Sequence, residues 1–376
     1  MTDDKRADLA GPGIGSYEEL VHELPASYES RLDRKETQRA LFAAKRFIED
    51  GLCHELDLIP VTVPLIVDKH SGVNDYLDRD GSRTPVGFHI SNDGGKNPID
   101  AEVVQAATKW KRVALAQLGM EPGEGLLTDM RAVRKDYFLD HDHSAYVDQW
   151  DWELAITREQ RELGFLTDVV KKIWKVLVNA EARVRALFPA LEEGPPPLPS
   201  ELTFLHAEEI LERYPDLPRK KRETAIVKEH GAVFIYGIGW PLADGLPHEL
   251  RAPDYDDWVT PTTSADGRPM HGLNGDILVW NPVTQRRHEL TSMGVRVDAE
   301  TLREQLRLSD QLDMLELPYH QAVLNDEVPL SIGGGIGQSR VFMLLLQKAH
   351  IGEVSVTVWP EALKKICRDK NIYVLE

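Results

Sequence analysis

Apolar residues that recur every three to four positions predict two long helices. The first spans residues 34–54, where one face is formed by Leu41, Ala44, Phe47, Ile48 and Leu52. The second begins near residue 166 and keeps a helical period up to Leu187. It ends before the Gly-Pro-Pro-Pro run 194–197, because proline lacks the amide hydrogen that a helix requires. Both helices are therefore expected to be amphipathic, with one apolar face.

Segments rich in β-branched and aromatic residues predict strands. Residues 126–134 and 144–153 form a long hairpin around the charged loop 135–143. Further strands are expected at residues 232–238, 276–280 and 288–297. The run 56–67 contains Pro60 and Pro64. These prolines cannot donate to a sheet, so this run is expected at an edge or an interface.

Shorter helices are predicted between these strands. Asn97-Pro98 reads as a cap followed by proline at the first helical position, and starts a helix that carries Lys109, Lys111 and Arg112. Other helices are expected at residues 207–213, at residues 219–230 and after Asp298. The glycine-rich segment 333–340 is expected to be a loop that opens a buried helix. Strands and helices in this order indicate an α+β fold with a mainly antiparallel sheet.

Composition limits the classes of function. The 376 residues carry a formal net charge of -18, which on average repels nucleic acid. No window approaches the ~18 apolar residues of a membrane span, and no signal peptide is visible, so we expect a cytoplasmic protein. Cys53 and Cys367 are too few for a disulfide framework and are expected to be unpaired thiols. Residues 1–27 are expected to form a mobile extension, and residues 28–376 a catalytic domain.

Several segments carry residues suited to nucleotide chemistry. A glycine loop that opens a helix suits an anion, and Arg340 at its end adds a guanidinium for phosphate. Asp276 and Glu289 lie on presumed neighbouring strands, where they could share Mg²⁺. The dinucleotide and phosphate-loop patterns are both incomplete here. The acidic segment 251–258 fits a solvated loop as well as it fits a binding site.

Two further sets of residues are candidates for binding. Alternation along a strand places Gln149, Asp151 and Glu153 on one face, where burial would require a polar partner such as a substrate. The 13 histidines show no metal-binding spacing, and we expect them at the surface.

These segments together are similar to the ammonia-dependent asparagine synthetase A family, a relative of the class II aminoacyl-tRNA synthetases. The resemblance covers roughly residue 30 to the C-terminus. It rests on Lys109-Trp110-Lys111-Arg112, Tyr146-Val147-Asp148-Gln149-Trp150-Asp151-Trp152-Glu153, Arg251 to Trp258, Leu273 to Pro282, and Gly333 to Arg340. It implies a class II synthetase-like catalytic core with helices flanking the sheet, and a homodimer formed through the first helix and the Pro64 strand.

The resemblance also implies roles for individual residues. Arg134 would contact the α-phosphate of ATP, and Arg340 would lie beside the nucleotide. Asp276 and Glu289 would hold magnesium, while Asp256 and Ser292 would line the AMP site. The positions that match aspartate-binding residues are Asp75, Lys111, Gln149, Asp151 and Arg296. Those assigned to catalysis are Asp75, Lys111, Arg134 and Arg340.

The implied reaction joins L-aspartate to ammonia at the expense of ATP, through a β-aspartyl-adenylate, releasing AMP and pyrophosphate. Neither cysteine lies in the context of a glutamine-hydrolysing nucleophile, which favours free ammonia as the nitrogen source. One departure concerns substrate binding: Gln105-Ala106 stands where the family commonly has His-Ser. Two alternatives stay open at this point, an aspartyl- or asparaginyl-tRNA synthetase-like paralogue and an inactive sensor of aspartate or nucleotide.

Overall fold

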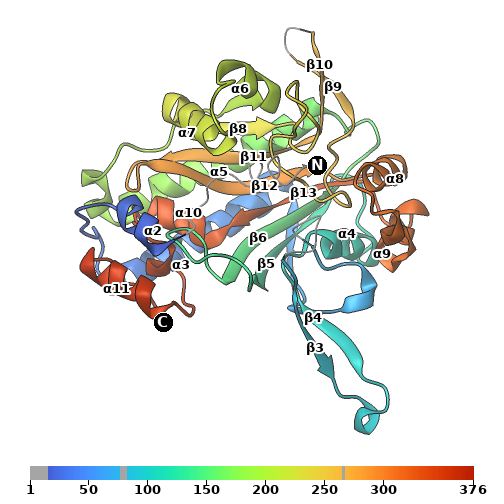
Figure 1. Ribbon diagram of the computed structural model, residues 1–376, viewed down its shortest axis with the longest axis horizontal. Coiled ribbons are helices and arrows are strands. Elements are labelled where there is room, and N and C mark those ends of the chain that lie inside the picture. The colour runs from blue at the N-terminus through green and yellow to red at the C-terminus, as the bar shows by residue number, and fades with distance from the viewer. Residues whose placement is uncertain (1–15, 77–82, 265–266) are drawn as a thin grey trace.

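The centre of the protein is an eight-stranded sheet (Figure 1). It is seen in a computed structural model that describes residues 16–76, 83–264 and 267–376. In spatial order the strands are β1 (Leu58–Val61), β5 (Gly125–Val133), β6 (Tyr146–Ala155), β13 (Ser331–Gly337), β12 (Arg286–Val295), β11 (Asn274–Asn281), β8 (Ala232–Tyr236) and β7 (Thr203–His206). The two outer pairs are parallel and the remaining pairs are antiparallel. The expected α+β class with a mainly antiparallel sheet is confirmed.

Three helices cover one face of the sheet. They are α3 (Arg34–Leu56), α5 (Leu163–Leu187) and α10 (Gln338–Leu345). Trp150 and Trp152 of β6 point into this layer and are fully buried. The Trp150 ring packs edge-on against Phe342, and its indole donates to Glu49 of α3. A capping box formed by Asp33 and Glu36 begins α3. The two long helices predicted from periodicity are confirmed.

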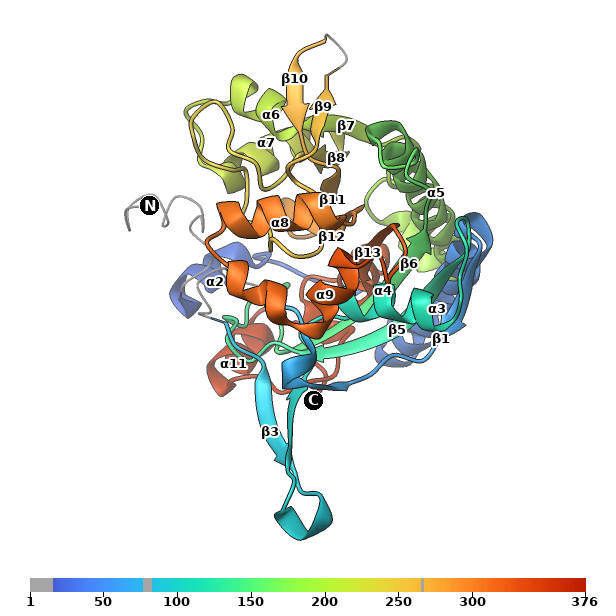
Figure 2. The ribbon, with the colours of Figure 1, turned by 90° about the vertical axis from the view of Figure 1, so that its right-hand side faces the viewer.

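On the opposite face, the helices of the described residues pack toward the two ends of the sheet. Helix α4 (Thr108–Gln117) packs on β5 and β6 through Leu115 and Leu126. Helices α6 (Ala207–Arg213) and α7 (Arg219–His230) pack on β7, β8 and β11. Helices α8 (Ala299–Leu308) and α9 (Pro318–Leu324) lie beside α4, as Figure 2 shows. Buried polar side chains, among them Asp151, Glu153 and Asp276, occupy the space between these helices.

A second, smaller sheet projects from the body as an arm (Figures 1 and 2). Its order is β2 (Ile66–Asp68), β4 (Ile99–Val103), β3 (Val86–Ile90), and a separate pair joins β9 (Pro261–Thr263) to β10 (Pro269–His271). The remaining elements are α2 (Tyr17–Glu23), α11 (Glu361–Asp369) and the 3-10 turns Lys69–Ser71, Asp93–Gly95, Pro189–Glu193, Leu312–Glu316 and Ile351–Glu353.

Two local predictions were wrong. Asn97-Pro98 leads into β4, and the helix with the two lysines begins only at Thr108. Pairing of β4 with both β2 and β3 outweighs the local cap signal. The expected glycine loop is also wrong, because residues 331–337 form β13 near the centre of the sheet. Low strand propensity of glycine is overridden there by pairing on both edges.

Part of the predicted N-terminal extension packs against the core. Residues 1–15 of the predicted extension lie outside the described residues. Within the rest of it, α2 places Leu20 in the main core, and Leu24 follows it there. The division at residue 28 stays a prediction. Among the described residues, no helix is both long and apolar enough to cross a membrane.

The glycines of β13 generate a stability prediction. A Cβ on Gly333 would overlap the carboxylate of Glu153 and lie 2.7 Å from the Arg296 guanidinium, whereas a Cβ on Gly337 would meet nothing closer than 3.6 Å. We expect Gly333→Ala to lower the free energy of unfolding by about 1–3 kcal/mol, because the strand must shift or the ion pair must open. Gly337→Ala is the matched control and should unfold near the wild-type urea midpoint. Equal midpoints for the two variants would contradict this account.

Candidate active site

Strand register brings the predicted polar residues into one row. Asp151 on β6 pairs with Gly335 on β13, Gly335 pairs with Ser292 on β12, and Ser292 pairs with Asp276 on β11. Directly paired residues share a face, so these side chains all point to the open side of the sheet. Gln149 and Glu153 lie on the same face, two residues either side of Asp151. The face predicted from alternation in β6 is confirmed.

A β-bulge places Glu289 on this face. The register between β11 and β12 shifts after Ile277, so that Leu278 pairs with Glu289. Without the extra residue, Glu289 would pair with Val279 and point to the opposite face. The bulge therefore directs the Glu289 carboxylate to the side of Asp276. The carboxylates of Asp276 and Glu289 can share one cation only if they lie on the same face of the sheet.

Arg134 and Arg340 both line one pocket of about 100 Å³. Arg134 follows β5 and donates from Nε to the carbonyl oxygen of Gln105 at 3.1 Å. Arg340 begins α10 and its Nη1 lies 3.4 Å from Glu289 Oε1. The remaining predicted residues that line this pocket are Gln149, Glu289 and Ser292. The predicted residues in this pocket thus come from β6, β12, the segment after β5, and α10.

A cluster of acidic and histidine side chains forms one wall of the same pocket. His143 Nδ1 lies 2.9 Å from Asp140 Oδ1 and 2.8 Å from Asp142 Oδ1, and its Nε2 lies 3.1 Å from Arg340 Nη2. Although burial opposes protonation, Asp142 and Asp140 raise the pKa of His143 to about 9. The expectation that histidines lie at the surface is wrong for His141, His206, His248, His288, His320 and His350, which are all buried.

The inner end of the site is a network of buried ions around Arg296. Its Nε donates to Glu153 Oε1 at 2.9 Å, and its Nη1 donates to Asp256. Lys111 Nζ donates to the carbonyl oxygens of Trp152 and Gly334 at 3.0 and 2.9 Å, and lies 3.9 Å from Asp151. Asp256 forms an ion pair with Arg296 and does not line the pocket that contains Arg134 and Arg340.

Gln105 connects the inner end of the site to Arg134, which lines the pocket described above. Its side chain donates to the carbonyl oxygen of Asp75 at 3.1 Å, and its own carbonyl accepts from Arg134. The side chain is 1% exposed. Gln105, which stands in place of the histidine of the family's usual His-Ser pair, therefore contacts both Asp75 and Arg134.

The electrostatics at Asp276 suit a cation. Burial raises the pKa of Asp276 to about 7; Arg251 offsets part of this, and Glu289 adds to the rise. Arg251 also donates to Ser292 at 2.8 Å. Two carboxylates on one face are hard oxygen donors, the type of ligand that Mg²⁺ prefers.

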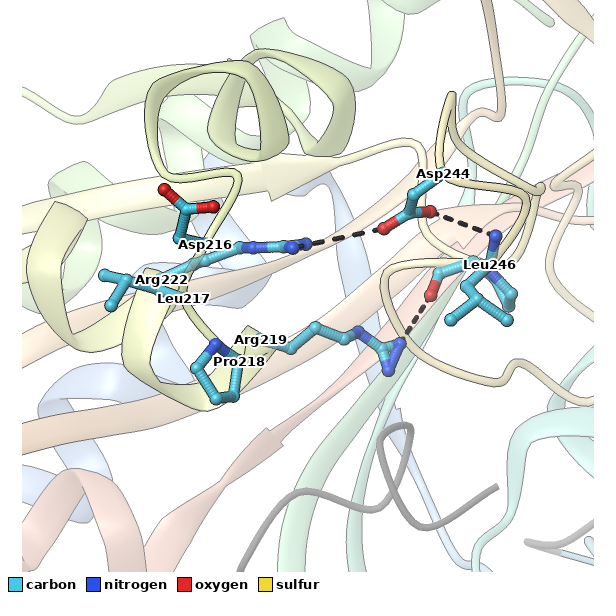
Figure 3. Close-up of a pocket in the computed structure, with 8 residues that line it drawn as sticks. Asp216, Leu217, Pro218, Arg219, Arg222, Asp244 and Leu246 are labelled. Carbon is cyan, nitrogen blue, oxygen red and sulfur yellow. Dashed lines mark hydrogen bonds and ion pairs between the residues drawn. The ribbon is translucent and has the colours of Figure 1, made fainter. Parts of the chain in front are cut away.

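A second pocket lies apart from these residues (Figure 3). It measures about 260 Å³ and is lined by the start of α7 and the segment 244–247. Arg219 donates to the carbonyl oxygen of Pro247, and Arg222 reaches toward Asp244 at 3.9 Å. Asp244 in turn accepts from the amide of Leu246. These contacts tie the helix to the loop, and the pocket contains none of the predicted site residues.

Sequence reasoning missed four residues near the site, namely Lys109, Asp254, His320 and Arg251. Lys109 had a visible signal, since it belongs to the Lys109-Trp110-Lys111-Arg112 segment and is buried on the same helix as Lys111. Arg251 and Asp254 belong to the acidic segment 251–258, and only the tertiary structure brings that segment next to Lys109 and His320.

Comparison with solved structures defines the fold class. The chain matches asparaginyl-tRNA synthetase from Pyrococcus horikoshii complexed with asparaginyl-adenylate, with a TM-score of 0.61 and 15% identity, over 87% of this chain and 70% of that one. It also matches the asparaginyl-tRNA synthetase of Entamoeba histolytica in complex with asparaginyl-adenylate, with a TM-score of 0.57 and 16% identity, over 85% of this chain and 66% of that one. The fold is that of the class II aminoacyl-tRNA synthetase core.

Comparison of sequences defines the family. The family model described as aspartate-ammonia ligase matches residues 35–371. Aspartate–ammonia ligase of Bacteroides fragilis is 46% identical over 93% of this chain and 98% of its own length. The Levilactobacillus brevis enzyme of the same name is 46% identical over 94% of this chain and 99% of its own length. The chain belongs to the aspartate–ammonia ligase family, and the family resemblance seen in the sequence is confirmed.

The burial of Asp75 generates a pH-dependent prediction. Burial raises the pKa of Asp75 from 3.8 to about 6, with Lys109 offsetting part of the rise. The folded protein therefore holds this proton more tightly than the unfolded chain, and wild-type stability falls as pH rises from about 4 to about 6. We expect Asp75→Asn to raise the free energy of unfolding by on the order of 1 kcal/mol near neutral pH.

This gain should fade below about pH 4, where the carboxyl is protonated in both states. Urea unfolding measured at acidic and neutral pH checks the expectation. Asp168→Asn is the control, because the Asp168 side chain is 71% exposed and should show no such dependence. A stability difference independent of pH would show that the Asp75 charge is not its cause.

Proposed function

We propose that this chain makes asparagine from L-aspartate, ammonia and ATP. In the first step the β-carboxylate attacks the α-phosphorus, the bond to the bridging oxygen breaks, and pyrophosphate leaves. In the second step ammonia attacks the activated carbonyl carbon, the bond to AMP breaks, and the nitrogen loses a proton. Membership in the aspartate–ammonia ligase family supports this reaction.

One observation carries the proposal beyond the family name. The pocket between Arg134 and Arg340 also includes Gly335, which pairs with Asp151, and Gln149, which lies two residues before Asp151 on the same face of β6. A nucleotide whose α-phosphate lies between the two guanidinium groups would therefore have its phosphorus beside the polar inner end of the site. Guanidinium groups are suited to the charge that develops on a transferring phosphate.

The aspartate would bind at the inner end. Lys111 uses two of its three donors on carbonyl oxygens, which leaves one for a substrate carboxylate. Arg296 retains donors beyond those used by Glu153 and Asp256. Gln149 and Asp151 would complete the polar contacts. Asp75 would hold an ammonium, that of the substrate or that of the incoming nitrogen source as it loses a proton.

Magnesium would be held by Asp276 and Glu289. The fit rests on the bulge that brings both carboxylates to one face and on the raised pKa of Asp276, which a cation would lower again. The metal would supply positive charge for the phosphates of ATP. In this proposal Asp256 and Ser292 line the AMP site. The proposal also includes ATP as the substrate and the cytoplasm as the location of the protein.

We also infer a homodimer that buries the edge of the sheet at β1. Phe42 of α3, Ile59 of β1 and Leu65 after it are 66%, 53% and 50% exposed in the single chain. Large apolar side chains gathered in neighbouring segments are typical of an interface. The first helix and the strand after it would then form the contact that the resemblance implies.

An assay of nitrogen source tests the reaction. With ATP, Mg²⁺ and aspartate, we expect ammonium to yield equal amounts of asparagine and AMP without any tRNA, whereas ammonia-free glutamine should yield almost none. Chelation of Mg²⁺ should stop both products. Arg134→Ala should lower kcat by about 10²–10³, because a donor to the transition state is lost. The control Arg158→Ala removes a surface guanidinium that is 67% exposed and should retain activity.

Two results would count against the reaction. Asparagine formation that requires tRNA would favour a synthetase-like paralogue. Binding of ATP without release of AMP would favour an inactive sensor.

A charge in the inferred interface tests the dimer. We expect Ile59→Asp to shift the protein toward monomer in sedimentation equilibrium, since an unpaired carboxylate is costly to bury. Leu308→Asp is the control, because Leu308 is similarly exposed at 43% but lies on α8, away from this edge. If Ile59→Asp associates as tightly as the control, β1 is not in the interface.

A further inference from the structure

Four buried groups from separate segments meet behind the inner end of the site. They are Asp75, Lys109 of α4, Asp254, and His320 of α9, each no more than 2% exposed. Lys109 Nζ donates to Asp254 Oδ2 at 2.7 Å, and His320 Nε2 lies 3.1 Å from the same oxygen. The nearest approach of Lys109 to Asp75 is longer, 3.9 Å to Oδ1. Asp254 therefore holds the lysine ammonium.

Asp75 is left with an unsatisfied oxygen. Its Oδ2 accepts from the amide of Thr108 at 3.3 Å, while Oδ1 is buried without a hydrogen-bond partner among the described residues. A buried carboxylate oxygen without a partner is costly, so the geometry calls for a donor that binds from outside the chain. An ammonium group fits, because it brings both hydrogen bonds and the opposite charge.

The carboxyl groups of Asp75 and Asp254 consequently differ in pKa. Burial raises the pKa of Asp75 to about 6, since Lys109 offsets it only in part. Burial acts on Asp254 as well, but Lys109 and His320 more than offset it and hold the pKa of Asp254 well below its usual range. The lysine is thus shared unequally between two acids that are both within its reach.

We propose that Asp254 is a positioning residue that keeps the Lys109 ammonium off Asp75, so that Asp75 stays open for the ammonium of a substrate. The proposal rests on the proposed function, in which Asp75 binds that group. It follows from the length and flexibility of lysine: a movement of about 1 Å would convert the 3.9 Å approach into a hydrogen bond. Without Asp254, Asp75 is the nearest remaining acid.

Other charged groups also face Asp75. Lys111 lies on the same helix as Lys109, Asp151 faces it from β6, and Tyr255 lies beside Asp254. Asp254 itself raises the pKa of Asp75 and of Tyr255, so its removal lowers the pKa of Asp75 even if Lys109 does not move. A double variant that also lacks the lysine charge separates the two effects.

The test is a pair of variants assayed for asparagine formation. In Asp254→Asn, the released lysine should pair with Asp75, and we expect the KM for aspartate or for ammonium to rise about tenfold or more. The KM for ATP should change little, since Arg134 and Arg340 are untouched. The acid limb of kcat/KM should move to lower pH, because loss of the Asp254 charge and approach of the ammonium both lower the pKa of Asp75.

The double variant Lys109→Met with Asp254→Asn separates positioning from structural support. It removes the competing ammonium together with its partner, and should return the affected KM to within about threefold of wild type. If Asp254 only supports the fold, the double variant should be no better than Asp254→Asn, and that result overturns the proposal. If Asp254→Asn does not fold, the charge-balanced double variant decides alone: a KM raised about tenfold or more overturns the proposal.

Failure of the proposed function would look different. If the wild-type protein makes no asparagine from aspartate and ammonium, the reaction itself is wrong. If the wild-type protein is active and the double variant shows no rescue, only the role of Asp254 is wrong. Circular dichroism of each variant confirms that the compared proteins are folded.

Discussion

The absence of side chains from one face of β13 is the constraint on which the rest of the site depends. Gly333, Gly335 and Gly337 pair with Glu153, Asp151 and Gln149, so each glycine leaves room beside a polar side chain of β6. The Glu153 carboxylate occupies the space where a side chain at position 333 would lie. That placement lets Arg296 reach it. A sheet with ordinary residues in its central strand would have filled this space with its own side chains.

Pairing of buried charge explains the arrangement around this opening. Arg296 is bound by Glu153 and Asp256, and Lys109 is bound by Asp254. Each of these ions would be costly to bury alone, which is why they occur in partnered sets. Asp75 is the exception among them, because one of its oxygens has no donor in the described structure. A site that binds an ammonium group requires such an unmatched anion.

The two ends of the site are held at a fixed separation by the sheet. Asp151, Ser292 and Asp276 belong to one row of directly paired residues. The bulge in β12 places Glu289 on the same face, paired with Leu278 two residues after Asp276. Gln105 joins Asp75 to Arg134 from the side. A nucleotide and an amino acid bound at the two ends would therefore meet in a geometry set by backbone hydrogen bonds rather than by flexible loops.

Amino-acid order by itself determined the elements with strong periodicity and supplied candidates for the site. The long helices expected near residues 34–54 and 166–187, the hairpin around Arg134 and the polar face of β6 follow from local spacing of apolar and polar residues. The segments that resemble the ligase family also identified the family. Local signals failed where distant pairing outweighed them. Asn97-Pro98 entered a strand, and the glycine run became β13.

Only the tertiary structure decided which charges neutralise one another. Lys109, Asp254 and His320 are far apart along the chain, and nothing in their local sequence shows that one carboxylate accepts from both the other groups. The same holds for the bulge at Leu278, which decides the face to which Glu289 points. The physical reason is that helical and strand periods are local properties, whereas partners of buried charges and the register between strands are set by packing across the whole fold.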